Sequence, residues 1–215
     1  MRWLSAVIVT VPLAAAAQPF QGTVFISPNV LTAEDPSSLA GVEYTGRGQR
    51  RIFDYRVMDW ITVDAYLFEA RIGGHPIEFQ VNPEFESEDA ARAQVDVYAP
   101  PLGRLPAVLL SRLQSVHVNA GTPGHPDGVR PWARPRNVFG GNYVDRSITV
   151  HTGRGQEYLR DGFLEEVLFH EGAHVSLQNH EEEPGWLAAQ AADPEFISDY
   201  ARDNPDREDV AESIL

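Results

Sequence analysis

Hydrophobic and polar residues alternate along much of the first third of the chain, in the pattern of half-buried strands. The alternation predicts two strands at residues 60–72 and 76–82, joined by a short glycine-containing turn at residues 73–75. Shorter β-prone runs predict further strands at residues 23–27, 42–46 and 51–56. We therefore expect residues 22–82 to be rich in β-structure.

The pattern changes to helical spacing after residue 86. Ser87 can cap a short helix, which Pro100 and Pro101 are expected to end. A second helix is predicted at residues 101–113, although Pro106 interrupts its first turn.

Two more strands are predicted at residues 115–121 and 147–153. Between them, residues 122–142 form a loop rich in Pro and Gly, and a loop of this length is often functional. Apolar residues then recur at helical spacing over residues 161–178, which predicts a helix of about four to five turns. The tail has three further helical segments, at residues 185–192, 194–202 and 206–215.

This order of elements predicts an α+β fold. We expect a twisted sheet, a backing helix and the long helix of residues 161–178, preceded by a β-rich N-terminal portion. The boundaries place that portion at residues 18–86 and a second portion at residues 87–215, with one continuous domain over residues 18–215 as the alternative.

Residues 1–17 have the pattern of a secretory signal peptide. A basic residue precedes an apolar run at residues 3–13, and Ala15 and Ala17 are placed for cleavage. The run is too short to span a bilayer, and no later stretch is long and apolar enough to do so. We expect the mature protein to begin at Gln18 and to be secreted or periplasmic.

Composition and charge narrow the possible partners. The chain has 17 basic and 31 acidic residues, a net charge of −14, and no evident basic patch, so we expect neither nucleic acid nor an anionic membrane as a partner. It has no cysteine, which excludes disulfides and thiolate ligands. Any metal ion must therefore be bound by His, Asp and Glu.

The pentapeptide HEGAH lies within the predicted helix of residues 161–178. His170 and His174 are four residues apart, which places both imidazoles on one face of a helix, where they can meet one ion. Glu171 lies one step round the helix, beside the ion. Two imidazoles and a third ligand can hold one Zn²⁺ with an open position for water, and Glu171 can act as the general base.

One candidate for the third ligand is His180, which follows His174 by six residues, as in the metzincin pattern. That pattern has a glycine midway, where this chain has Leu177. It also has a methionine downstream, whereas Met1 and Met58 both lie upstream.

The other candidate is Glu208, on the last predicted helix. Glu212 lies four residues later on the same face, where it can accept a hydrogen bond from a ligand imidazole and fix its orientation. Tyr200 can donate its phenol to the oxyanion of a tetrahedral intermediate. The residues themselves leave the choice between Glu208 and His180 open.

HEGAH, Tyr200 and the REDVAE run of residues 207–212 together resemble the gluzincin zinc peptidases, especially the anthrax-lethal-factor-like branch. The resemblance covers residues 163–215. It implies a zincin-like fold with a twisted sheet, a backing helix and an HExxH active-site helix. It also implies roles for six residues: zinc binding by His170, His174 and Glu208, general-base action by Glu171, oxyanion donation by Tyr200, and orientation of a ligand imidazole by Glu212.

The motif and the resemblance predict a secreted zinc metallopeptidase that hydrolyses peptide bonds in a peptide or protein substrate. The alternative is a catalytically inactive secreted binding or scaffold module with a structural zinc site. Glu171 favours the enzyme, because a structural site needs no general base beside two ligands. We expect the strand at residues 147–153 to bind the substrate backbone as an added strand, and the turn at residues 140–143 to shape the rim of the cleft. The sequence does not indicate an oligomeric state.

Overall fold

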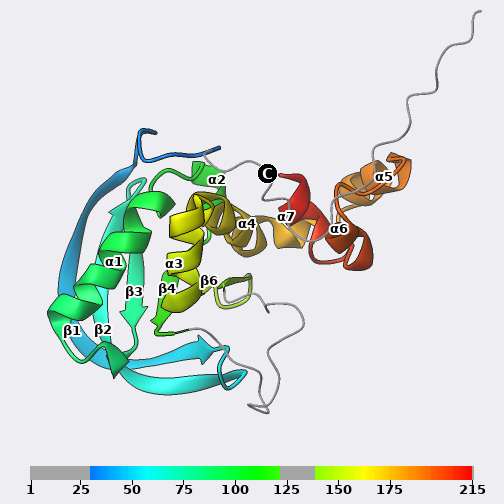
Figure 1. Cartoon of the computed structure of the whole chain (residues 1–215). Helices are drawn as coiled ribbons and strands as arrows, with labels where there is room; N and C mark the ends of the chain where they lie inside the picture. Colours follow the sequence, from blue (N-terminus) through cyan, green and yellow to red (C-terminus); the bar gives the residue numbers. More distant parts are fainter. Residues whose placement is uncertain (1–29, 122–138, 215) are drawn as a thin grey trace, which may run out of the picture.

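The computed structural model describes residues 30–121 and 139–214. The predicted signal peptide, the strand predicted at residues 23–27 and most of the loop predicted at residues 122–142 lie outside the described residues. The fold is α+β: a six-stranded mixed open sheet is followed by helices, as the order of elements predicted (Figure 1).

The first three strands form an antiparallel meander. β2 (Asp59–Ile72) and β3 (His75–Val81) confirm the predicted hairpin, and Gly73 and Gly74 supply the positive φ angles of 58° and 83° in its turn. The two short strands predicted before them are one strand, β1 (Leu39–Asp54). The two predicted strands merge because β2 is long enough to pair with the whole of β1. The alternation of apolar and polar residues is interrupted within β1 because the pairing register shifts between Tyr44 and Gly46.

β4 (Ser115–Asn119) pairs parallel with β3, and β6 (Ser147–His151) pairs parallel with β4. β5 (Phe139–Asn142) pairs antiparallel with β6 and forms the edge of the sheet, so residues 140–142 lie in a strand rather than in the predicted turn. Both edges of β6 are occupied, by β4 and β5. The expectation that a substrate adds to β6 is therefore wrong, because the edges of the sheet among the described strands are β1 and β5.

The helices after β3 differ from the prediction at their ends. Ser87 caps α1 (Glu88–Leu102) as predicted, and its hydroxyl accepts a hydrogen bond of 3.1 Å from the Ala90 N–H. The helix continues through its two prolines and ends at Leu102. The second predicted helix is reduced to one turn, α2 (Ala107–Leu110), which begins directly after Pro106.

The apolar core lies on one face of the sheet. α1 packs on β1, β2 and β3, whereas α3 (Thr152–Asp161) and α4 (Leu164–Leu177) pack on β6, and Figure 1 shows α1 and α3 over the same face. The inward residues of β4 and β6 belong to the same core. α4 confirms the long predicted helix, shortened at its start because Gly162, with φ 77°, ends α3. The core residues that these strands contribute are Val116, Val118, Ile148 and Val150.

The other face of β4 and β6 is polar, yet it is also buried, because the end of the β1–β2 hairpin curves across it (Figure 1). The side-chain amide of Asn119 donates to the Phe53 carbonyl at 2.9 Å, and the Tyr55 N–H donates to His151 Nε2 at 3.2 Å. We call this set of buried side chains the polar layer: Ser115, His117, Asn119, Ser147, Thr149 and His151.

The tail is helical, as predicted, with α5 (Pro184–Ala192), α6 (Asp199–Asp203) and α7 (Asp209–Ser213). α5 extends away from the sheet, whereas α7 returns to contact α4 (Figure 1). This return brings residues 208–212 beside the HEGAH pentapeptide. Among the described helices, none has the length and apolar character needed to cross a membrane.

Candidate metal centre

α4 is held from behind by α2, and this contact explains the glycine inside HEGAH. A Cβ added at Gly172 would lie 3.3 Å from the Leu109 Cβ, and the Ser176 hydroxyl donates to the Leu109 carbonyl at 2.7 Å. Gly172 is therefore a site of close helix packing, and this packing fixes how α4 presents its opposite face.

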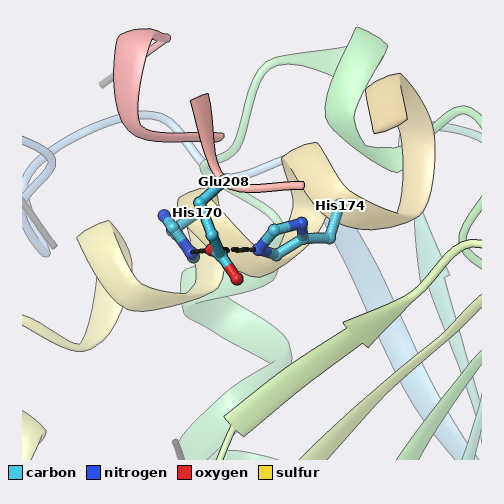
Figure 2. Close-up of side chains that lie close together, drawn as sticks. All are labelled: His170, His174 and Glu208. Carbon is cyan, nitrogen blue, oxygen red and sulfur yellow. Dashed lines mark hydrogen bonds and ion pairs between the residues drawn. The ribbon is translucent and has the colours of Figure 1, made fainter. Parts of the chain in front are cut away.

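That face presents His170 and His174, and Glu208, the residue directly before α7, lies beside them (Figure 2). His174 Nε2 lies 3.1 Å from both His170 Nε2 and Glu208 Oε2, and His170 Nε2 lies 3.4 Å from Glu208 Oε2. The two imidazole rings stand nearly perpendicular, with an interplanar angle of 83°. One atom of each side chain thus points to a common centre.

The three side chains could bind a metal ion. Ligand atoms about 2.0–2.1 Å from a tetrahedral zinc ion lie about 3.4 Å from one another, close to the three separations here. Two imidazole nitrogens and a carboxylate oxygen are also a donor set that zinc accepts. Within residues 30–121 and 139–214, this is the one group of three His or acidic side chains with such convergence.

The centre is buried and rich in carboxylates. His170 and Glu208 are 1% exposed and His174 is 5% exposed. Glu212 is also buried, and its Oε1 lies 3.5 Å from His170 Nδ1 on the side away from the common centre. Buried carboxylates are costly unless positive charge compensates them, so the arrangement favours a cation.

The pKa values reflect this mutual attraction. Burial alone would raise the pKa of Glu208, but the hydrogen bonds from His170 and His174 reverse the effect and hold that pKa well below its usual range. Burial would lower the pKa of His170, yet the bond to Glu208 and the nearby negative charges raise it. The raised pKa of His170 reflects the surrounding carboxylates, and the same negative charge favours a cation at the common centre.

More acidic residues lie on the α7 side of the centre. Burial raises the pKa of Glu181 to about 8, and the negative charges of Glu208, Asp209 and Asp206 add to the shift, with Arg207 opposing it. Arg207 Nε lies 3.1 Å from Glu208 Oε1, and its side chain is largely exposed. One exposed arginine does not balance so many carboxylates.

Glu171 lies beside the three convergent residues and contacts the edge strand. Its Oε2 accepts a hydrogen bond of 2.6 Å from the Gly141 N–H. A Cβ added at Gly141 would lie 2.1 Å from the Glu171 carbonyl oxygen and 2.8 Å from the His174 Cβ. Only glycine therefore allows β5 to approach α4 this closely.

The remaining predicted residues divide into two groups. The Tyr200 hydroxyl donates to Glu208 Oε1 at 2.9 Å, so it holds the oxygen that faces away from the common centre. Glu212 lies beside His170, where a group that orients this imidazole is expected. His180 lies apart: it is exposed, and its Nδ1 is 2.8 Å from Glu183 Oε1.

Tyr55 is a residue of this region that the sequence did not suggest. It comes from the turn between β1 and β2, and its hydroxyl lies against Gly140 of β5. No motif surrounds it, and only the fold brings it near α4.

No family model, curated protein or solved structure matches the chain. The fold and the site define a class: an α+β protein with a buried His170, His174 and Glu208 group that could bind one metal ion. A more particular assignment is a proposal, and it rests on the chemistry of the site.

Proposed function

We propose that the protein is a zinc-dependent metallopeptidase of gluzincin type, with a zincin-like fold, that hydrolyses peptide bonds. The observation that carries the proposal is the placement of Glu171, a carboxylate that is not one of the three convergent residues but lies directly beside them. The signal-peptide pattern adds a secreted or periplasmic location to the proposal.

In this mechanism His170, His174 and Glu208 would hold the ion, through the convergent atoms Nε2, Nε2 and Oε2. When bound, zinc acts as a Lewis acid and lowers the pKa of a water molecule at its open position. Glu171 would take a proton from water as the water oxygen bonds to the peptide carbonyl carbon, and would pass that proton to the amide nitrogen as the C–N bond breaks. The Gly141 N–H holds Glu171 Oε2 and leaves the other carboxylate oxygen for this transfer.

The residues around the centre have supporting roles. Glu212 orients the imidazole of His170, because a carboxylate beside the second ring nitrogen fixes the ring and raises its basicity. Tyr200 orients Glu208 in the structure, and donation to the oxyanion would require its hydroxyl to leave that carboxylate. The free edge of β5 is the place where an extended peptide can pair with the sheet.

The alternative is an inactive secreted binding or scaffold module with a structural zinc site. The observation in its favour is the low exposure of the three convergent residues, at most 5%, since structural sites are closed to solvent. The two functions differ in what they require of Glu171.

The experiment compares wild type with Glu171→Gln and with Glu165→Gln. Glu165 is a matched control on the same helix, where it pairs with Arg104 at 2.8 Å. Zinc content is measured by elemental analysis, and cleavage is measured with a peptide library. We expect Glu171→Gln to keep one zinc ion and to lose at least about 100-fold in kcat, the effect of removing a general base. Glu165→Gln is expected to retain both properties. Wild-type protein that holds zinc but cleaves no peptide would favour the structural site.

A further inference from the structure

Tyr55 is held rigidly at the end of the β1–β2 hairpin. Its N–H donates to His151 Nε2 at 3.2 Å, and its ring packs edge-on against Phe53 at a centroid distance of 4.9 Å. The His151 ring packs against it from another side at 5.9 Å. These contacts anchor the ring, so the hydroxyl at its far end has a defined position.

That hydroxyl lies on the face of β5 opposite α4. A Cβ added at Gly140 would lie 1.8 Å from the Tyr55 hydroxyl oxygen, whereas one added at Gly141 would meet Glu171 and His174. The two glycines face in opposite directions because successive residues of a strand do so. β5 therefore runs between the phenol and the metal centre, and neither glycine places a side chain between them.

The phenol is within electrostatic reach of the metal centre. Burial raises the pKa of Tyr55 above its usual range, the negative charges of Glu171 and Glu208 add to the shift, and Arg207 opposes it. A phenol in this field stays protonated and acts as a hydrogen-bond donor.

The donor is not used inside the described protein. Within residues 30–121 and 139–214, the Tyr55 hydroxyl has no hydrogen-bond partner, whereas the Tyr200 hydroxyl is committed to Glu208 Oε1. A half-buried phenol usually finds a partner for its hydroxyl. The hydroxyl lies against β5, an edge strand of the described sheet, and this position points to a partner that arrives with the substrate.

We propose that Tyr55 binds substrate, and that its hydroxyl donates a hydrogen bond to a main-chain carbonyl oxygen of an extended peptide lying along the free edge of β5. The neighbouring carboxylates disfavour an anionic acceptor, so a neutral carbonyl is the acceptor that fits a donor at this place. This inference rests on the proposed function, because it takes a peptide as the substrate.

The test measures binding without turnover, in a zinc-loaded Glu171→Gln background. The probe is fluorescein-labelled unfolded casein, and fluorescence anisotropy gives an apparent Kd. Adding Tyr55→Phe removes one hydroxyl and keeps the ring. We expect it to raise the Kd by about tenfold, the loss of one hydrogen bond, with zinc content unchanged. Tyr44→Phe is the matched control, because Tyr44 lies on β1 and packs on Phe68 at 5.1 Å.

A second variant, Gly140→Ala, changes the surroundings of the Tyr55 hydroxyl rather than the tyrosine itself. The added methyl of Gly140→Ala would displace the end of the Tyr55 side chain and weaken casein binding to a similar degree. The double variant Gly140→Ala/Tyr55→Phe is expected to bind casein much more tightly than two independent losses would predict, because both substitutions remove the same hydrogen bond to the peptide. Thermal melts of the same variants give their Tm. A substitution that only damages the structure would lower Tm as well as casein affinity, whereas loss of the hydrogen bond alone would leave Tm unchanged.

Equal casein affinity in the Tyr55→Phe and Tyr44→Phe variants would overturn the inference, and so would the absence of binding to every variant. The proposed function fails in a different way. If zinc-loaded wild type cleaves no casein while Tyr55→Phe still weakens binding, the site binds peptide but is not a peptidase.

Discussion

Two pairs of histidines are buried among the residues that the structure describes, and the two pairs are arranged differently. His117 and His151 lie in the polar layer, on the face of the sheet under the β1–β2 hairpin, whereas His170 and His174 lie on α4. All four side chains are at most 5% exposed. Burial alone therefore does not distinguish a candidate metal-binding histidine from a structural one.

The two pairs of histidines differ in the groups that contact their ring nitrogens. In the polar layer, His117 Nδ1 lies 3.2 Å from the Thr149 hydroxyl and its Nε2 lies 3.4 Å from the Ser115 hydroxyl. His151 Nε2 accepts the Tyr55 N–H. Each ring there is bound by polar groups of the protein, mostly neutral ones.

In the candidate metal centre the ring nitrogens converge on each other and on a carboxylate. The pKa shifts follow: burial lowers the pKa of His117 to about 4, against the weaker influence of Glu78, whereas the carboxylates raise the pKa of His170. What distinguishes a candidate metal site is convergence on one point together with excess negative charge.

The largest expected effect is the loss of the metal ion. Glu208→Ala removes the carboxylate on which both imidazoles converge, and we expect elemental analysis to find less than about a tenth of the wild-type zinc. EDTA is expected to lower the Tm of wild type and to leave that of Glu208→Ala unchanged.

The control for this prediction is a carboxylate at the end of β1, beside the polar layer. Asp54 lies 3.6 Å from His151 Nε2 and resembles Glu208 in burial, so Asp54→Asn removes a buried carboxylate beside a histidine. It is expected to keep full zinc content. Equal zinc loss in both variants would show that the two regions do not differ as described.

The next effect is a loss of stability in acid that originates in the polar layer. The folded state holds His117 with a pKa of about 4, below its ordinary value of 6.5, so the unfolded state binds more protons in that range. The contribution of neutral His117 to the free energy of unfolding is fully present above pH 6.5. It falls as the pH approaches 4, by about 3 kcal/mol between pH 7 and 4.

Urea unfolding in the Glu208→Ala background measures this effect without a contribution from zinc release. His117→Gln is expected to give a free energy of unfolding that depends less on pH than that of the parent. His151, whose pKa burial also lowers against the attraction of Asp54, keeps part of the dependence in both proteins. Identical pH profiles for the two proteins would contradict the assignment to His117.

These two regions also show what the sequence could and could not predict. The β2–β3 hairpin, the Ser87 cap and the helix that became α4 depend on neighbours in the sequence, so local patterns were sufficient. The four-residue spacing of His170 and His174 is also local.

The polar layer and Tyr55 depend on a hairpin that curves across strands more than 60 residues away in sequence, as in the Asn119 bond to Phe53. Nothing in the alternation of β1 indicates that curvature. For the same reason the sequence placed the substrate edge on β6, since it contained no signal that β5 would form and occupy that edge.

A smaller effect is expected at Glu212. Glu212→Gln removes the negative charge beside His170 Nδ1 but keeps the three convergent residues, so zinc affinity is expected to fall by about 10–100-fold rather than to vanish. A competition titration with a chelator measures it. Asp209→Asn is the control on the same helix, because Asp209 is bonded to Gln190 at 2.9 Å. Equal losses in both variants would assign the effect to overall charge rather than to the orientation of His170.

The smallest effect is expected at His180, the other histidine with ligand spacing. Its side chain is 47% exposed and is bonded to Glu183, and it does not belong to the convergent group. His180→Ala is therefore expected to change the zinc Kd by less than about twofold, because an exposed pair of this kind contributes little. Loss of zinc from this variant, measured by the same chelator titration, would mean that the chain turns back after α4 as in the metzincin pattern. Leu177, at the position where that turn requires glycine, is the physical reason to expect otherwise.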